Sequence, residues 1–462
     1  MTFSSGKHIV IIGGGFCGIM TAVNLLIKAE SPLNITLFNY EYPEGRGIAY
    51  KTYTDNHVLN VPCQNMSAFS DQPDHFLNWC KLNSGNAVDI EELPGKFLPR
   101  NLYGNYLDSV FQESLKNKSD HVNFRMIKEE VTDIDKIGES YFITSSSGLK
   151  IESDKIVLAT GNHAPSHPPL AGTEFHSNKR YFANPWKEDS ISNIDSTEPI
   201  LIVGTGLTMV DVVLGLEEKQ FSGKIVALSP NGFNILAHKK HHPQRYILDE
   251  LAPPFDLNKL FKLFYKHVRE AHLRGESGET VVDAVRSQTQ VIWQQLSLDD
   301  KKRFMAHLRH LWGVARHRLP GEIHAKIQSM ISNKTLQVMA GRISGIDESS
   351  ECLEVKIALR GSENSETIKV QRIINCTGPL TDITKFQSKL YSNLLRKKII
   401  RPDDMKLGVD ATAEGRIIDE KGNESNSIFT LGSLLKGKLW ESTAVPELRK
   451  QAEILAKLLL TK

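Results

Sequence analysis

The sequence predicts an α/β fold with two Rossmann-like dinucleotide-binding domains, each with a β-meander, and a helical insertion in the second domain. A buried strand, a glycine-rich turn and a helix occur twice in the same order, at residues 8–28 and 199–216. Each copy closes with an apolar strand that ends in Thr-Gly, at 155–161 and 372–378. A single glycine motif is a weak signal, but this repeated order of elements is typical of a duplicated nucleotide-binding architecture.

The first glycine turn has the composition that a dinucleotide requires. Gly13, Gly15 and Gly18 follow the strand, where the chain must turn tightly, approach a pyrophosphate and pack the helix against the strand. The N-terminus of the helix then directs free N–H groups and the positive end of its dipole at the phosphates. We therefore expect the first nucleotide at this turn.

The ribose position of the first copy departs from the usual pattern. A second strand is expected at 35–38, and the residue after it, where a carboxylate normally binds the ribose hydroxyls, is Asn39. An amide oxygen accepts a hydrogen bond without charge assistance, and Glu41 lies two residues further on. The alternation of polar and apolar residues at 122–149 predicts the meander of this copy.

The second copy is less regular. Gly204 and Gly206 are present, but Met209 occupies the third glycine position, which predicts looser packing of helix on strand or a displaced nucleotide. The strand at 224–228 is followed by Ser229–Asn231, which contains neither the acidic residue that favours NAD nor the arginine that favours NADP. Nearby cations that could bind a phosphate, or form a solvated basic loop, are Lys239, Lys240 and Arg245.

The remaining segments complete two domains. The stretch 237–333 is rich in helix formers with apolar residues three and four apart, and we expect a helical insertion that either covers a substrate site or serves packing and assembly. A second meander is expected at 336–370. A strand at 427–433 and a helix at 445–460 would return the chain to the first domain. The expected domains are 1–168 with 371–462 for the first, and 169–370 for the second.

Charge and cysteine content exclude several classes of function. Lys and Arg number 56 against 54 Asp and Glu, for a net charge of +2, which predicts no nucleic-acid partner and no membrane surface. The longest apolar runs are far shorter than the roughly 20 residues of a membrane-spanning helix. The 5 cysteines are scattered without a CxxC pair, so no dithiol centre is predicted, and we expect a cytoplasmic protein.

Two polar clusters are further candidates for sites. His238, His241 and His242 lie in a lysine-rich loop without an acidic or cysteine partner at ligand spacing, which favours a solvated loop, and no metal is expected. The stretch Arg316–Arg318 beside Trp312 could hold an anionic substrate or the nicotinamide phosphates, and a charge cluster at a helix end is equally compatible with it.

Several motifs together resemble two-domain FAD/NAD(P)-binding flavoproteins of bacteria, over nearly the whole chain. The motifs are IIGGGFCG, GRGIAY, HVLNVPCQNMSAF, LPRNLYGNYL, LATGNHAP, NPW, IVGTGLTMVD, RHRLP and LWESTAVPELRKQA. The resemblance implies that FAD lies on the first unit, with its adenine end near Glu41 and Val131. It implies that Gly432 matches the glycine of a Gly-Asp pair in related flavoproteins. Ser433 replaces the Asp, so contacts to the ribityl chain are expected from backbone N–H groups.

The same resemblance assigns the remaining site residues. Trp440 and Glu441 are expected beside the flavin ring as the residues nearest the chemistry. The isoalloxazine is expected near Arg46, Tyr50, Asn60 and Met66. The expected cofactor contacts are Gly13, Gly15, Phe16, Cys17, Gly18, Asn39, Glu41, Arg46, Tyr50, Asn60, Met66, Val131, Thr160, Gly161, Gly204, Gly206, Thr208 and Gly432.

A partial match bears on the type of reaction. The linker around Leu170, Gly172, His176 and Ser177 is similar to the FxGxxxHS signature of class B flavin monooxygenases, with Leu in place of Phe. This match adds modest support for an oxygenase, and a coincidental loop motif is equally compatible with it.

The leading hypothesis is an FAD-dependent oxidoreductase that uses NAD(P)H and oxygenates a small molecule. The alternatives are a flavin reductase or dehydrogenase without oxygen insertion, and a flavin-binding module whose second nucleotide site is degenerate, as Met209 and residues 229–231 suggest. The sequence leaves open the substrate, the choice between NADH and NADPH, and the oligomeric state.

Overall fold

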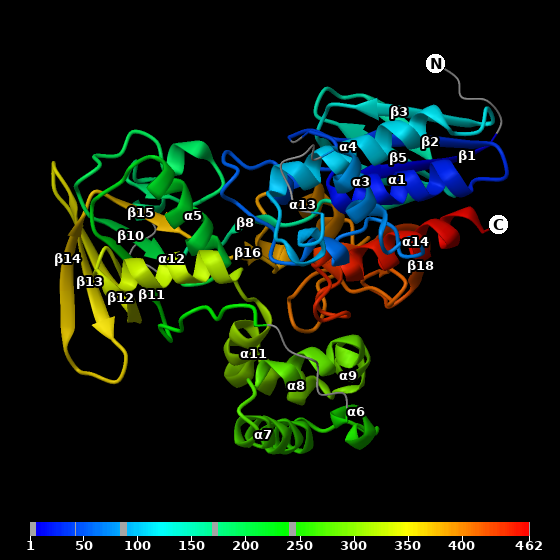
Figure 1. Ribbon diagram of the computed structural model, residues 1–462. Helices are drawn as coiled ribbons and strands as arrows, with labels where there is room; N and C mark the ends of the chain where they lie inside the picture. The colour runs from blue at the N-terminus through cyan, green and yellow to red at the C-terminus, as the bar shows by residue number, and fades with distance from the viewer. Residues whose placement is uncertain (1–5, 42, 84–89, 169–173, 240–245, 462) are drawn as a thin grey trace.

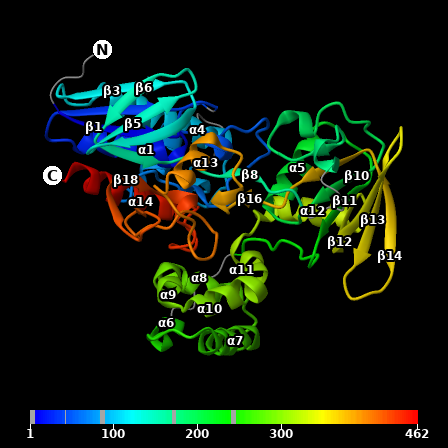
Figure 2. The same ribbon diagram turned by 180° about the vertical axis from the view of Figure 1, so that it is seen from behind.

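The computed structural model describes residues 6–41, 43–83, 90–168, 174–239 and 246–461. They form two sheet-centred units and a lobe of helices that lies below the space between them (Figure 1). The view from behind shows the same three parts, with the first strand, β1, and the last helix, α14, both in the first unit (Figure 2). The predicted α/β fold with two nucleotide-binding units and a helical insertion is confirmed.

The first unit is built on a six-stranded sheet in the order β17, β18, β7, β1, β2, β3. Its strands are β1 (Lys7–Ile12), β2 (Leu33–Phe38), β3 (Val122–Ile127), β7 (Lys155–Leu158), β17 (Arg416–Ile418) and β18 (Glu424–Thr430). The pairs that β1 makes with β2 and β7 are parallel, and β18 joins β7 in the same direction. The C-terminal strand therefore returns the chain to the first unit, as the sequence predicts.

The apolar run of β1 follows from burial on both faces. Ile9 and Ile11 belong to the core beneath the helices α1, α4 and α14, whereas Val10 and Ile12 belong to the core on the other face. Parallel strands covered on both faces show continuous apolar runs for this reason. The helices of this unit are α1 (Phe16–Lys28), α2 (Gly47–Tyr50), α3 (His75–Asn83), α4 (Arg100–Lys116), α13 (Lys389–Arg396) and α14 (Val445–Leu460).

The first meander is shorter than the sequence predicts. Residues 122–127 form β3, which pairs in parallel with β2, so this part of the alternating stretch belongs to the main sheet. An edge strand with one buried face has the same alternation as a meander strand, which is why the pattern alone did not separate them. The meander itself is the antiparallel sheet of β4 (Val131–Ile137), β5 (Ser140–Ser145) and β6 (Lys150–Ser153).

The second unit repeats the arrangement around β10. Its seven-stranded sheet has the order β14, β13, β12, β11, β10, β15, β9. The strands are β9 (Tyr181–Phe182), β10 (Ile200–Val203), β11 (Ile225–Ser229), β12 (Leu336–Glu348), β13 (Leu353–Leu359), β14 (Ser365–Val370) and β15 (Arg372–Asn375). The helix α5 (Leu207–Glu218) follows β10. The predicted meander at 336–370 is present, and its first strand begins as a parallel partner of β11.

One predicted domain boundary is wrong by a strand. The expected division at residue 371 assigned 372–375 to the first domain, but β15 pairs in parallel with β10 of the second sheet. The chain crosses between the units at two short strands instead, β8 (His163–Pro165) and β16 (Pro379–Leu380), which pair with each other. Figures 1 and 2 both show this pair between the two units.

The helical insertion is also shorter than 237–333. The helix α12 (Gly321–Ser332) packs Ile327 into the core of the second sheet and leads into β12, so it belongs to that unit. The lobe below consists of α6 (Ile247–Glu250), α7 (Leu257–Leu273), α8 (Glu279–Ala284), α9 (Thr289–Gln295), α10 (Leu298–Arg303), a π-helical turn at Phe304–Leu308 and α11 (Arg309–Arg316). Within the described ranges, no helix is long and apolar enough to cross a membrane.

At Gly18, α1 packs so closely against the preceding turn that no side chain fits. A Cβ added at Gly18 would lie 1.8 Å from the carbonyl oxygen of Gly13. We expect Gly18→Ala to lower the free energy of unfolding by about 1–3 kcal/mol, because the helix must move away from the strand. Urea denaturation followed by circular dichroism measures this change.

The matched control is Gly321→Ala in the first turn of α12, where no atom lies within 4 Å of an added Cβ. In this open position, alanine should leave stability unchanged or raise it slightly. An equal effect of the two substitutions would contradict the role of the close contact.

Candidate functional site

A cleft of about 440 Å³ opens at the carboxyl ends of β1 and β7. Its floor is the turn Gly13–Cys17, and α1 begins within this turn. In the described part of the chain, no side chain caps the N-terminus of α1 by a hydrogen bond. The first N–H groups of the helix therefore lie beside the cleft, together with the positive end of the helix dipole, as an anion site requires.

The glycines hold the backbone close to this floor. Gly13 has a φ of +107°, and a Cβ there would lie 2.4 Å from the carbonyl oxygen of Ala159 on the neighbouring strand. A Cβ on Gly14 would meet the side chain of Asn39 at 2.4 Å. A bulky ligand such as a pyrophosphate can reach the backbone N–H groups because these positions carry no side chain.

Asn39 and Glu41 both line the cleft beyond the end of β2. Asn39 is 7% exposed and donates its backbone N–H to the carbonyl oxygen of Ile127 at 3.0 Å. Glu41 is exposed. The two side chains differ in solvation, and the exposed carboxylate is the one that can reach out to a ribose.

The loop between β3 and β4 supplies a second carboxylate that the sequence analysis missed. Glu129 lines the cleft near Val131, and its Oε2 accepts a hydrogen bond from Ser147 Oγ at 2.6 Å and another from Ser145 Oγ. These hydroxyl groups lower the pKa of Glu129. No local motif marks this residue, because it reaches the cleft only through the pairing of β4 with β5.

The helix α2 lines the cleft, and its first residue, Gly47, packs against Gly15 of the glycine turn. The N–H of Gly45 donates to the carbonyl oxygen of Gly14 at 2.8 Å, which fixes this segment against the floor. Arg46 lines the cleft, donates to the carbonyl oxygen of Asn101 at 3.2 Å and also donates to Asn105 Oδ1. Tyr50 lines the cleft and burial raises its pKa, so its phenol stays neutral.

The end of β7 forms the opposite wall. Thr160 and Gly161 line the cleft, and Thr160 Oγ1 lies 2.7 Å from Tyr391 OH on α13. His163 also lines it, with its ring stacked on Phe386 at a centroid distance of 3.7 Å. Burial lowers the pKa of His163 to about 4, so the ring is neutral near pH 7.

The segment after β18 borders the cleft, and it revises the expectation that the backbone N–H of Gly432 contacts the ribityl chain. Gly432 has a φ of +76°, and its N–H donates to Gln451 Oε1 at 2.8 Å, so this N–H is already occupied. Ser433 lines the cleft, and its Oγ is buried without a hydrogen-bond partner among the described residues. The hydroxyl of Ser433 is therefore the polar group that this segment offers to a ligand.

Two of the expected flavin contacts lie away from the cleft. Met66 is 2% exposed in the core beneath α1. Asn60 is exposed, and its carbonyl oxygen accepts from His238 Nε2 at 3.1 Å. Both follow a strand-like segment whose course depends on packing between the two units. Gly18 lies under the turn, where it packs helix on strand.

Trp440 and Glu441 lie at the junction with the helical lobe and do not line the cleft. Trp440 stacks on Trp293 of α9 with centroids 5.0 Å apart. Glu441, with a φ of +68°, accepts from Trp312 Nε1 at 2.8 Å and pairs with Arg316 at 3.5 Å. These contacts hold the lobe against the segment that follows Ser433.

The predicted polar clusters have structural partners. Arg318 forms an ion pair of 2.6 Å with Asp283 of α8, and Arg316 pairs with Glu441, so neither guanidinium is reserved for a phosphate. His238 packs on Phe97, and burial lowers the pKa of its ring to about 4. The predicted residues Lys240, His241, His242, Arg245, Leu170 and Gly172 lie outside the described residues. Within those described, no group of three or more His, Cys, Asp and Glu could hold a metal ion.

The second glycine turn has the backbone geometry of the first. Gly204 has a φ of +116°, and a Cβ there would lie 2.3 Å from the carbonyl oxygen of Cys376. Gly206 precedes the first turn of α5, which contains Thr208, and open space surrounds it. Met209 is buried in the core of this unit at 3% exposure.

An arginine from the meander reaches the ribose position of the second unit. Arg360, which follows β13, donates from Nη1 to Asn231 Oδ1 at 2.8 Å. Its backbone N–H donates to the carbonyl oxygen of Ala340, which pairs with Ser229 at the end of β11. The sequence analysis missed this cation because it lies far along the chain from the strand whose end it joins.

The comparisons with known proteins agree with this architecture. A family model described as FAD-NAD(P)-binding matches residues 10–163, which confirms the expected resemblance over the first unit. No curated protein is significantly similar in sequence.

Solved structures match over the full length at low identity. The ornithine N-hydroxylase of Kutzneria sp. 744, in a complex with reduced FAD, NADP+ and L-ornithine, is 15% identical, with 98% of this chain and 99% of that chain covered and a TM-score of 0.66. The ornithine hydroxylase of Pseudomonas aeruginosa is 13% identical, with 98% of each chain covered and a TM-score of 0.67. The bacillithiol disulfide reductase of Bacillus cereus is 15% identical, with 98% of each chain covered and a TM-score of 0.56. These likenesses show the two-domain flavoprotein fold.

The neutral ring of His163 makes stability depend on pH. The folded-state pKa of His163 is lowered from 6.5 to about 4. The contribution of the neutral ring to the free energy of unfolding is therefore complete above pH 6.5 and is lost as the pH falls toward 4. The variant His163→Phe retains the stacking on Phe386 but cannot titrate. Between pH 7 and 4.5 we expect its free energy of unfolding to fall less than that of the parent protein, with a difference of up to about 3 kcal/mol. Urea denaturation at a series of pH values measures the difference.

His272→Phe, at an exposed position on α7, serves as the control and should follow the parent protein. The same loss of stability in His163→Phe as in the parent would show that the buried ring is not responsible.

Proposed function

We propose that this protein is an FAD-dependent oxidoreductase that uses NAD(P)H, and that it is a monooxygenase acting on a small molecule. The observation that carries the proposal is the pairing of an open dinucleotide cleft in the first unit with a second glycine turn of the same geometry. The full-length likeness to FAD- and NADP-dependent hydroxylases supports it. We assign FAD to residues 6–168 and 379–461, and NAD(P)H to residues 174–378.

The residues of the cleft fit FAD. The uncapped N-terminus of α1 suits the pyrophosphate, Glu41 and Glu129 suit the ribose and adenine end, and the unpartnered hydroxyl of Ser433 suits the ribityl chain. FAD held by these residues would supply the redox chemistry that links NAD(P)H to oxygen. Asn184 of the second unit also lines the cleft, which is where the two nucleotides would meet.

The chain's own residues position the cofactors. Tyr50 and His163 are neutral at pH 7 and offer uncharged walls to a flavin. The ion pair of Arg100 Nη1 with Asp211 Oδ2, at 3.0 Å, and the hydrogen bond from His57 to the carbonyl oxygen of Asp211, at 2.8 Å, join the first unit to α5 of the second. These buried contacts fix the distance between the two glycine turns.

A thiol mechanism is a poor fit. Cys17 is the cysteine that lines the cleft, and burial raises the pKa of its thiol to about 12. A thiol with such a pKa is not a nucleophile at neutral pH. This observation favours the monooxygenase over a disulfide reductase that works through protein thiols. The free cysteines also fit the cytoplasm, which remains our proposed compartment.

The first experiment is anaerobic mixing of the FAD-loaded protein with NADH or NADPH, followed by oxygen. We expect the visible absorbance of the flavin to disappear with one of the nucleotides. Slow recovery of the absorbance in oxygen supports the monooxygenase, whereas immediate recovery with stoichiometric hydrogen peroxide supports a reductase or oxidase. No loss of absorbance with either nucleotide would contradict the proposal and favour the binding module.

Arg360 generates a second prediction. Because its guanidinium lies at the ribose position of the second unit, we expect it to bind the 2′-phosphate of NADPH. Arg360→Ala should raise the KM for NADPH about tenfold and change the KM for NADH less than twofold, as measured by the rate of flavin reduction.

The control is Lys369→Ala, a cation on the adjacent strand β14 that pairs with Glu354 at 3.1 Å. It should alter neither KM. Equal effects of Arg360→Ala on the two nucleotides would refute the assignment of the phosphate to Arg360.

A further inference from the structure

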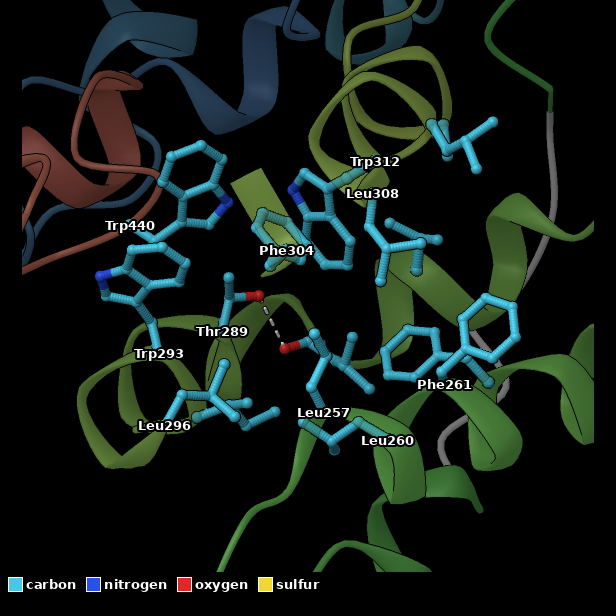
Figure 3. Close-up of a pocket in the computed structure, with 16 residues that line it drawn as sticks. Leu257, Leu260, Phe261, Thr289, Trp293, Leu296, Phe304, Leu308, Trp312 and Trp440 are labelled. Atoms are coloured by element: carbon cyan, nitrogen blue, oxygen red, sulfur yellow. Dashed lines mark hydrogen bonds between the residues drawn. The ribbon is translucent and has the colours of Figure 1, made fainter. Parts of the chain in front are cut away.

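The helical lobe contains a second cavity, of about 260 Å³, which is distinct from the dinucleotide cleft. Helices α7, α8, α9 and α11, together with the π-helical turn, form most of its wall, and Trp440 completes it from the first unit (Figure 3). Its wall is almost entirely apolar. Thr289 is its one hydroxyl residue among those described, and this hydroxyl donates to the carbonyl oxygen of Val285 at 3.1 Å.

The cavity offers no charge to an occupant. Among the described residues, those that line it include no Asp, Glu, Lys or Arg. Trp312 directs its N–H outward to Glu441, and Trp293 donates its N–H to the carbonyl oxygen of Gly437 at 2.8 Å. Trp440 Nε1 is buried without a hydrogen-bond partner among the described residues, so the wall can still donate one neutral hydrogen bond. A charged group inside would lose its hydration without gaining a partner of opposite charge. L-Ornithine, which is bound in the complex of the Kutzneria hydroxylase, carries charges at both ends and does not match this lining.

One wall of the cavity is formed by the π-helical turn and α11, which carry a row of large apolar side chains. Phe304, Leu308 and Trp312 recur every fourth residue, and all three line the cavity (Figure 3). Phe304 and Leu308 are the first and last residues of the π-helical turn, a rare departure from the α-helix that is frequently found at functional sites. This turn brings large apolar side chains to one face.

The cavity opens to the surface, and one chain segment borders both this cavity and the dinucleotide cleft. Phe261 and Leu311 line it and are 51% and 52% exposed, so they mark the opening to solvent. The other end is Trp440. The chain segment 433–443 lines the dinucleotide cleft at Ser433 and Thr443, and it lines the apolar cavity at Trp440 between them.

We propose that this cavity binds the substrate, and that the substrate is a small uncharged apolar molecule, such as a substituted benzene or a short alkyl chain. The substrate role rests on the proposed oxidoreductase function, whereas the binding of apolar molecules does not. An apolar cavity of about 150 Å³ in another protein takes up benzene, and the present cavity is larger. Its position next to the segment that borders the cofactor cleft favours a substrate over a docked protein.

The test uses the FAD-loaded protein and toluene as the probe. Isothermal titration should show saturable binding of one toluene per chain. Ala315 lines the cavity, and Ala315→Phe fills it, so we expect binding at least tenfold weaker. Leu311→Glu places a charge at the exposed rim, where folding tolerates it, and should also weaken binding at least tenfold.

The matched control is Ala306→Phe, which changes an exposed alanine on the same stretch of helix that does not line the cavity. It should bind toluene like the parent protein. Circular dichroism and flavin content establish that each variant is folded, and Leu311→Glu keeps the test valid if Ala315→Phe does not fold.

Equal binding of toluene in all variants, or its displacement by ornithine, would overturn the proposal. The proposal would also be overturned if the parent protein binds no toluene but forms a dimer, and if Leu311→Glu dissociates this dimer. The apolar face would then be an interface between copies of the chain. Toluene should also accelerate the consumption of NAD(P)H in the parent and not in Ala315→Phe. If toluene binds as expected while neither nucleotide reduces the flavin, the oxidoreductase function fails and the apolar binding site stands.

Discussion

The contact of Gly18 with the carbonyl oxygen of Gly13 is the constraint on which the first unit depends. It places α1 directly over the end of β1, so that the first N–H groups of the helix lie at the cleft floor. The cleft then needs little else for an anion, because the glycine turn presents backbone groups in place of side chains. In the second unit the third position is Met209 of α5, which is buried in the core, so the turn geometry at Gly204 tolerates a larger residue there.

The segment after β18 joins the three parts of the molecule. Ser433 faces the dinucleotide cleft, Trp440 stacks on Trp293 of the lobe, and Glu441 holds Trp312 and Arg316. A second ion pair, between Arg286 of the lobe and Glu447 of α14, is 3.1 Å long and lies beside it. The Arg286–Glu447 pair is partly exposed and contributes little to stability, whereas the tryptophan stack and the Arg316–Glu441 pair are largely buried. A ligand in the apolar cavity would therefore act on the same segment that borders the cofactor.

The two units differ in the side chains near the end of the second strand. The first unit has Asn39 and Glu41 near the end of β2, and Glu129 from the loop before its meander lines the same cleft. The second has Asn231 at the end of β11, with the guanidinium of Arg360 held against it. In each unit a residue from another part of the chain, Glu129 or Arg360, therefore adds a charged group beside the end of the second strand.

The sequence by itself determined the two nucleotide-binding units, because a strand, glycine turn and helix are local features encoded by adjacent residues. It also determined the return of the chain to the first sheet and most residues of the cleft floor, such as Gly13, Asn39 and Thr160. Only the tertiary structure decided that β3 belongs to the main sheet, that β15 belongs to the second unit and that α12 is not part of the lobe. It alone brought Glu129, Arg360 and Trp440 to their sites. The pattern of polar and apolar residues shows that a segment is a strand or a helix with a buried face. It does not show which other strand or helix packs against that face, because the pattern is the same for each choice of neighbour.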